Sequence, residues 1–202
     1  MPASIVDLCS RTAVLYEINM THVLSIFLFD TLNIFWLGLG LFLAAILEAF
    51  LWKTPVFQFF NTPIQTEWFG ANKKWRGLIS LPIAHTVSVC LFQFFEHLFL
   101  SNSDFFIWFS SFNLFGYGLL VGFVFNLAEL PNSFVKRRLN IPPGDESSRL
   151  FYFIDHMDST FGVVILWYFY FQFPTHLTIA GFIVTPLLFM GATALRKKLG
   201  LK

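Results

Sequence analysis

One polar stretch, residues 125–160, carries most of the side chains in this sequence that could perform chemistry. It contains an acid at Glu129, a basic triplet at 136–138 and an acidic pair at Asp155 and Asp158. Carboxylates can hold a divalent cation and basic groups can hold phosphates, so the combination indicates phosphoryl or nucleotidyl transfer. The competing interpretation is a solvated loop between two membrane helices, whose basic residues only set the topology.

The spacing within this stretch places reactive groups on common helical faces. In a helix, Glu129, Ser133 and Lys136 recur at intervals of four and three residues and share one face. Asp155 and Asp158 are three residues apart, so a helix would align both carboxylates at the N-terminal end of the following span. Such hard oxygen ligands suit Mg²⁺, which shares substrate phosphates. Asp158 could instead simply cap that span.

A second polar segment, residues 53–77, ends in the sequence ANKKWRG. Its cations Lys73, Lys74 and Arg76 could neutralise a triphosphate. Asn72 could add directional hydrogen bonds to a phosphate or a base. Two basic loops on one side of a membrane, flanking three acids, predict a single nucleotide site.

The elements that must position these groups are membrane helices. Of the 202 residues, 56% are hydrophobic and only 12% are charged, whereas soluble domains carry roughly 25% charged residues. This composition predicts an all-α, polytopic integral membrane protein with about five transmembrane helices and two cytoplasmic polar loops. Apolar runs of sufficient length put the spans at about 32–52, 78–100, 105–127, 159–173 and 177–195. Residues 1–31 are then an N-terminal extension without an assigned role, ahead of a membrane-embedded domain at 32–202.

The distribution of basic residues predicts the orientation. With five spans, all of the 13 Lys and Arg residues except Arg11 fall on one side of the membrane, which is the cytoplasmic side by the positive-inside rule. The N terminus is therefore expected outside the cell membrane and the site inside. In the second span, His85, Glu96 and His97 leave open a small transporter, because ionisable groups within membranes often mark transport pathways. In the third span, glycines give a small-residue face for close helix packing; they are Gly116, Gly118 and Gly122.

Two motif blocks resemble a known family. FGANKKWRGLI (69–79) resembles the FGxNKTWRGxI segment of CDP-archaeol synthases. These are CTP-dependent cytidylyltransferases for ether-lipid phosphate, related to bacterial phosphatidate cytidylyltransferases. ELPNSFVKRRLNIPPGDESSRLFYFIDHMDST (129–160) is similar to that family's GDLxxSFxKRRxGIKPG…LDQLDF, and TPVF (54–57) is similar to its SPVL. The likeness covers about residues 32–198, with the blocks in the same order.

The resemblance implies a reaction and its residues. The expected activity is Mg²⁺-dependent transfer of CMP from CTP to a phospholipid acid, either phosphatidate or an ether-lipid analogue, giving a CDP-lipid and pyrophosphate. Glu129, Asp155 and Asp158 match the acids expected to bind metal, and Lys136 joins them as a catalytic group. Residues expected to bind CTP are Asn72, Lys73, Trp75, Arg76, Ser133, Lys136 and Arg137. Membrane lipid is a further partner, no nucleic acid is expected, and a homodimer is left open.

The chain also departs from the family pattern. Glu129 stands where the family has Asp, Lys74 replaces Thr, and Asn140 stands in for Gly. Pro131 lies inside what should be a continuous helix, where it removes a backbone donor and could bend the chain. These departures motivate an alternative, a catalytically inactive family member that binds lipid or a partner.

Overall fold

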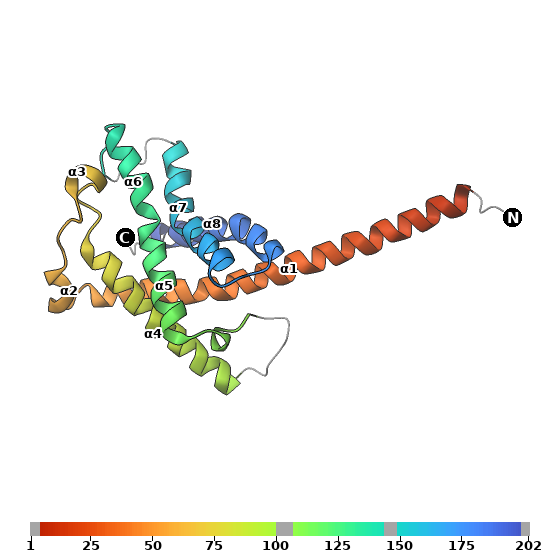
Figure 1. Ribbon diagram of the computed structural model, residues 1–202, viewed down its shortest axis with the longest axis horizontal. Coiled ribbons are helices and arrows are strands. Elements are labelled where there is room, and N and C mark those ends of the chain that lie inside the picture. Colours follow the sequence, from red (N-terminus) through yellow and green to blue (C-terminus); the bar gives the residue numbers. More distant parts are fainter. Residues whose placement is uncertain (1–4, 100–106, 144–148, 199–202) are drawn as a thin grey trace.

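The computed structural model describes the chain over residues 5–99, 107–143 and 149–198, and this part is helical without a β-strand (Figure 1). The all-α class predicted from composition is confirmed. In chain order the helices are α1 (Ile5–Leu51), α2 (Pro55–Phe59), α3 (Thr66–Phe69), α4 (Trp75–Phe99), the 3-10 turn η1 (Phe109–Ser111), α5 (Leu114–Leu127), α6 (Glu129–Arg138), α7 (Arg149–Phe169) and α8 (Thr175–Lys198).

Several of these helices have the properties of membrane spans. Within the described ranges, three segments are long and apolar enough to cross a membrane, namely Met20–Leu51, Trp75–Phe99 and Leu114–Arg138. Thr175–Gly191 is a shorter apolar helix. These four correspond to the first, second, third and fifth predicted spans. Helix α7, which contains residues 159–169 of the fourth predicted span, is not among the helices that meet this criterion of length and apolarity.

Helix α1 differs from the prediction at its N-terminal end. It runs without interruption from Ile5 to Leu51, so the described part of the N-terminal extension continues the same helix as the first span. The apolar segment Met20–Leu51 includes residues ahead of the predicted start at residue 32. The 47 residues of α1 amount to roughly 70 Å at 1.5 Å per residue. Its N-terminal half projects away from the remaining helices (Figure 1).

The third span begins later than predicted, because α5 starts only at Leu114. The carboxylate of Glu96 explains part of this difference. It accepts hydrogen bonds from the backbone N–H groups of Phe109, at 2.8 Å, and Ser110, at 2.7 Å. These bonds hold η1 against α4, and the side chain of Asn113 then caps α5. Residues 107–113 are therefore not part of a span-length helix.

Glycines allow α4 and α5 to cross closely, as the sequence predicted. A Cβ added to Gly118 would lie 2.6 Å from Thr86 Cα, and one on Gly122 would lie 2.7 Å from Pro82 Cα. Only glycine permits this approach, which is typical of membrane helix pairs. Gly116 serves differently, because its N–H donates to the cap of α5.

The core lies where α1, α4, α5, α7 and α8 meet. Its largest fully buried apolar side chains come from α1, α4, α5, α7 and the turn η1. They are Tyr117, Phe109, Ile34, Leu37, Val89, Val121, Val163 and Val164. Helix α8 adds Leu177, Ala180 and Val184. This cluster fixes the relative positions of the helix ends from which the polar segments emerge.

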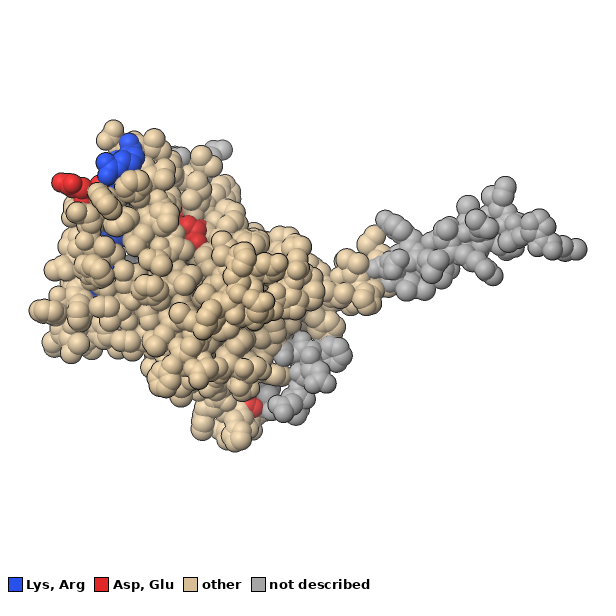
Figure 2. Space-filling view, viewed as in Figure 1, with Lys and Arg blue, Asp and Glu red and all other residues tan. Residues whose placement is uncertain are grey.

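The polar segments gather at one end of the molecule. Helices α2, α3 and α6 lie away from the N terminus (Figure 1), and α3 packs on α6 while α6 packs on α7. On the face shown in Figure 2, most of the surface is uncharged, and acidic and basic side chains collect chiefly over this end. A β-bridge between Pro63 and Lys74 closes the first loop on itself.

Candidate active site

Helix α6 carries the first group of predicted site residues. It follows α5 directly, with Ala128 between the two helices, so the continuous helix expected from the sequence is interrupted there. Pro131, the third residue of α6, has no backbone N–H to donate to Leu127 O four residues earlier, and the helix is broken between these two positions. Ser133 and Lys136 are buried on the face they share with Glu129.

Helix α7 carries the two aspartates, but not at its N-terminal end. The helix begins at Arg149, so Asp155 lies on its second turn and Asp158 on its third. The predictions that both residues stand at the helix N terminus and that Asp158 caps it are therefore wrong. The helix dipole acts mainly within the first turn, so other groups must balance these carboxylates.

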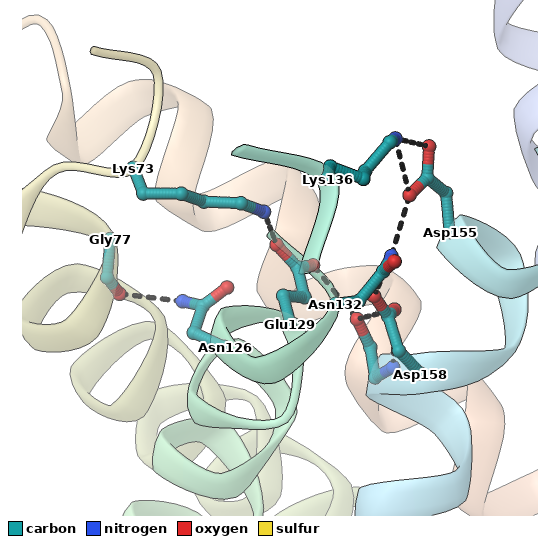
Figure 3. Close-up of polar contacts among 9 residues, drawn as sticks. Lys73, Gly77, Asn126, Glu129, Asn132, Lys136, Asp155 and Asp158 are labelled. Atoms are coloured by element: carbon teal, nitrogen blue, oxygen red, sulfur yellow. Dashed lines mark hydrogen bonds and ion pairs between the residues drawn. The ribbon is translucent and has the colours of Figure 1, made fainter. Parts of the chain in front are cut away.

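Asn132 and Lys136 of α6 provide this balance (Figure 3). Asn132 Nδ2 donates to Asp155 Oδ1 at 2.6 Å and to Asp158 Oδ2 at 2.8 Å. Lys136 Nζ lies 2.8 and 2.6 Å from the two carboxylate oxygens of Asp155. The Lys136 side chain is only 7% exposed, and a buried ammonium is costly unless it is paired. Asp155 therefore stabilises Lys136 in this position.

Glu129 joins the first polar loop to α7. Its Oε2 forms an ion pair with Lys73, and its Oε1 accepts a hydrogen bond from Ser159 Oγ at 2.8 Å. Ser159 Oγ also lies 3.2 Å from Asp158 Oδ1. The two polar loops, which the sequence predicted to form one site, are thus brought together in one hydrogen-bonded network (Figure 3).

Asp158 has the most clearly perturbed acidity in this network. Burial raises the pKa of its carboxyl to about 6, and the nearby Glu129 carboxylate acts in the same direction. The hydrogen bond from Asn132 and the charge of Lys73 oppose the increase. A cation bound beside Asp158 would favour its ionised form. Perturbed carboxyl groups of this kind are common at functional sites.

Arg137 has donors that the protein leaves unused. Its Nε and Nη1 atoms are buried and have no hydrogen-bond partner among the described residues. Its Nη1 lies beneath the first loop, 3.1 Å from where a Cβ on Gly70 would stand. Buried donors without a partner are costly, and a guanidinium fits the geometry of phosphate oxygens. Arg137 is therefore suited to an anionic ligand.

The remaining residues predicted to bind CTP surround this network. Asn72 lies in the first loop beside Gly70, and Trp75 opens α4 with 46% of its surface exposed. The guanidinium of Arg76 lies over the ring of Trp52, 4.2 Å from its centre. Within the described parts of the chain, none of these three predicted ligands forms a hydrogen bond or ion pair with the acids of α6 and α7.

The acids fit Mg²⁺ in donor type. No group of three or more His, Cys, Asp or Glu side chains among the described residues is placed to hold a metal ion. However, Asp155 Oδ1 and Asp158 Oδ2 both bond the same nitrogen of Asn132, so they face one common point. Mg²⁺ is usually held by one or two carboxylates together with substrate phosphates and water. The assignment of Asp155, Asp158 and Glu129 as metal ligands stays a prediction.

Two network residues, Asn132 and Ser159, were not among the predicted site residues. Both are uncharged, so a search for acids and bases passes over them. Their spacing was the available signal: Asn132 is three residues after Glu129 and four before Lys136. Ser159 is four residues after Asp155 on α7. Residues at these intervals share a helical face.

Two of the three ionisable residues of the second span, His85 and Glu96, have contacts to neighbouring elements. His85 is fully buried, and its Nδ1 lies 3.0 Å from the carbonyl oxygen of Gly118 on α5. Glu96 bonds the backbone of η1, as described above, and also accepts from Trp36 Nε1 at 3.0 Å. His97 is exposed in the last turn of α4. These contacts give His85 Nδ1 and both oxygens of Glu96 structural partners, whereas His85 Nε2 is buried without a hydrogen-bond partner among the described residues.

The chain belongs to the CarS-like family of CDP-archaeol synthases, whose family model matches residues 31–202. No curated protein and no solved structure matches the chain significantly. The family match confirms the resemblance carried by the two motif blocks. Together with the apolar helices, it identifies an integral membrane protein of a family that transfers a cytidylyl group from CTP to a lipid.

Proposed function

We propose that this family member transfers CMP from CTP to a phospholipid acid in a Mg²⁺-dependent reaction, giving a CDP-lipid and pyrophosphate. The observation that carries this proposal is the meeting of α6 and α7. There, oxygens of Asp155 and Asp158 converge on one point, and the neighbouring Arg137 has two buried nitrogens without a protein partner. Anionic metal ligands beside unused guanidinium donors suit a metal-bound triphosphate.

The reaction needs little proton transfer. An oxygen of the lipid phosphate attacks the α-phosphorus of CTP, a new P–O bond forms, and the bond from the α-phosphorus to the bridging oxygen breaks. Pyrophosphate leaves with that electron pair. Because the lipid phosphate is already ionised at neutral pH, positioning and charge neutralisation supply most of the catalysis. Mg²⁺ bound through Asp155 and Asp158 would neutralise charge on the phosphate oxygens.

The cations divide into two groups with different roles. Lys73 and Lys136 are paired with Glu129 and Asp155, so they hold the acids in place and add positive potential to the site. Among the described residues, Arg76 and Arg137 form no ion pair with an acid, so their donors are available to the triphosphate. Asn72, Trp75 and Ser133 complete the proposed nucleotide surface.

The charge distribution supports a cytoplasmic site. Both polar loops lie at the end of the molecule that collects charged side chains (Figure 2), and this end carries most of the basic residues of the sequence. By the positive-inside rule it faces the cytoplasm. The N terminus of α1, which projects from the other side of the bundle (Figure 1), would then lie outside.

The test is pyrophosphate release from CTP by the purified full-length protein. Phosphatidate and an ether-lipid phosphate are offered separately, with and without Mg²⁺. We expect release that requires lipid and metal and falls at least a hundredfold in Asp155→Asn. Glu67→Gln is the matched control, because Glu67 is an exposed acid of α3 and its loss should leave the rate unchanged. Full activity in Asp155→Asn would remove this aspartate from the metal site.

The inactive-relative alternative, motivated by Glu129 and Pro131, is a second proposal. The break between α5 and α6 at Ala128 lies just before Pro131, as expected for a residue without a backbone donor. This alternative would be supported if the protein is folded and monodisperse but neither binds CTP nor releases pyrophosphate with either lipid. In that case Glu129→Asp is the variant to assay next.

A further inference from the structure

The guanidinium of Arg76 is held by an aromatic ring and not by an acid. Arg76 lies in the first turn of α4, with its guanidinium carbon 4.2 Å from the centre of the Trp52 ring. Its backbone N–H donates to Phe60 O at 2.9 Å. Among the described residues, no carboxylate forms an ion pair with Arg76. Stacking uses the flat face of a guanidinium and leaves the N–H groups on its edge free to bind an anion.

The Trp52 ring is in turn fixed by two polar side chains. Its Nε1 donates to Ser80 Oγ at 2.9 Å, and Ser80 Oγ donates to Glu48 Oε1 at 2.6 Å. Ser80 is fully buried. The Ser80 hydroxyl accepts one hydrogen bond from the indole and donates another to the carboxylate, so it orients both groups together.

These four residues form two matched helical pairs. Glu48 and Trp52 are four residues apart at the end of α1, where Trp52 N donates to Glu48 O at 3.0 Å. Arg76 and Ser80 are four residues apart at the start of α4. Residues at this interval lie one turn above each other. Two neighbouring helices, α1 and α4, therefore present an aromatic–hydroxyl–acid support on which Arg76 rests.

The support lies next to the proposed nucleotide site. Gly77, which follows Arg76, accepts a hydrogen bond at its carbonyl oxygen from Asn126 Nδ2 on α5 at 2.7 Å (Figure 3). Lys73, three residues before Arg76, pairs with Glu129 of α6. The first turn of α4 is thus tied to the α5–α6 segment on one side and to the end of α1 on the other.

We infer that Glu48, Trp52 and Ser80 are positioning residues that hold Arg76 toward the phosphates of CTP. This inference rests on the proposed function, and it extends the site to the end of α1, which supplies none of the residues discussed above as ligands. A stacked guanidinium loses less freedom when it binds phosphate than an unrestrained side chain does. Glu48 holds the Trp52 ring through Ser80, and its carboxyl also interacts with the charge of Arg76, without a direct ion pair among the described residues.

The experiment is a double-mutant cycle on nucleotide affinity. Full-length protein in detergent is titrated with CTP and, separately, with CMP, both in Mg²⁺ and without lipid, using isothermal titration calorimetry. The proteins are the wild type, Trp52→Leu, Arg76→Ala and the double variant. We expect Trp52→Leu to weaken CTP binding about tenfold, the scale of a partly desolvated cation–π contact, and to leave CMP binding unchanged. In the Arg76→Ala background, Trp52→Leu should have no further effect.

Other outcomes overturn the inference, and they separate it from the proposed function. Equal loss of CTP and CMP affinity in Trp52→Leu, or effects of the two substitutions that add in full, would show that Trp52 only supports the fold. A wild-type protein that binds no CTP would overturn the proposed function and this inference with it. Trp52→Phe keeps a ring but loses the bond to Ser80, so we expect about threefold weaker CTP binding. If Trp52→Leu does not fold, Trp52→Phe takes its place in the double-mutant cycle with Arg76→Ala.

Discussion

Replacing Gly70 with alanine would test whether the first loop places Arg137 for the nucleotide. Gly70 has φ +87° and ψ 163°, a combination essentially restricted to glycine, and other residues adopt it at a cost of about 1–3 kcal/mol. An added Cβ would also lie 3.0 Å from Asn72 Oδ1, 3.0 Å from Pro143 Cγ and 3.1 Å from Arg137 Nη1. These neighbours would have to move.

We expect the loop to relieve this strain by shifting relative to Arg137, while the helical bundle stays folded. Restoring the binding conformation would then cost the same 1–3 kcal/mol, which corresponds to roughly 5- to 150-fold weaker CTP binding. Calorimetric titration with CTP and Mg²⁺ measures the affinity, and thermal unfolding of the same preparation reports on the bundle.

Gly191→Ala is the matched control for this substitution. Gly191 is an exposed residue of α8, and a Cβ added there would meet no atom within 4 Å. This variant should bind CTP like the wild type and unfold at the same or a slightly higher temperature, because alanine favours the helix. If Gly70→Ala binds CTP within twofold of the wild type, the loop does not place Arg137 and the reasoning is refuted.

Three further substitutions test other parts of the structure. Asn132→Asp puts a third carboxylate between the two aspartates of α7, so its unfolding temperature should fall without Mg²⁺ and recover when Mg²⁺ is added; a Mg²⁺ response equal to that of the wild type would contradict this. Glu96→Gln weakens the bonds that hold η1 and should lower the free energy of unfolding by about 1–3 kcal/mol, with unchanged CTP affinity in the titration. Gly118→Leu forces a side chain against Thr86 and should cost about 1–3 kcal/mol by overpacking, seen as a lower unfolding midpoint; a midpoint equal to that of the wild type would mean that α4 and α5 do not cross closely there.

Helical periodicity was sufficient to predict the two faces that form the site. Glu129 and Lys136 are seven residues apart, and Asp155 and Asp158 are three apart, so each pair shares a face once its segment is helical. The structure brings these faces together, because α6 continues from α5 and α5 packs on α7. Helices pack in this way because they bury apolar faces against one another, and the apolar composition of the chain also indicated such packing.

Helix boundaries were less predictable, because hydropathy and helix formation respond to different forces. The first turns of α7 contain acids, which lower hydropathy, so the predicted span began only at residue 159 although the helix begins at Arg149. Residues 107–113 show the opposite case. They lay within a predicted span, yet Glu96 accepts hydrogen bonds from the backbone N–H groups of Phe109 and Ser110, and Asn113 accepts one from Gly116. These bonds stabilise a 3-10 turn followed by a capped helix, and hydropathy does not report such side-chain contacts.

Glu129 illustrates how one departure from the family motif is accommodated in this chain. Its two carboxylate oxygens serve different elements, with Oε2 paired to Lys73 of the first loop and Oε1 bonded to Ser159 of α7. An aspartate at this position would be shorter by one methylene, so it could keep both contacts only if α6 moved toward the loop and toward α7 together. The longer side chain of Glu129 reaches both partners from the position that α6 occupies, so the geometry accounts for this substitution.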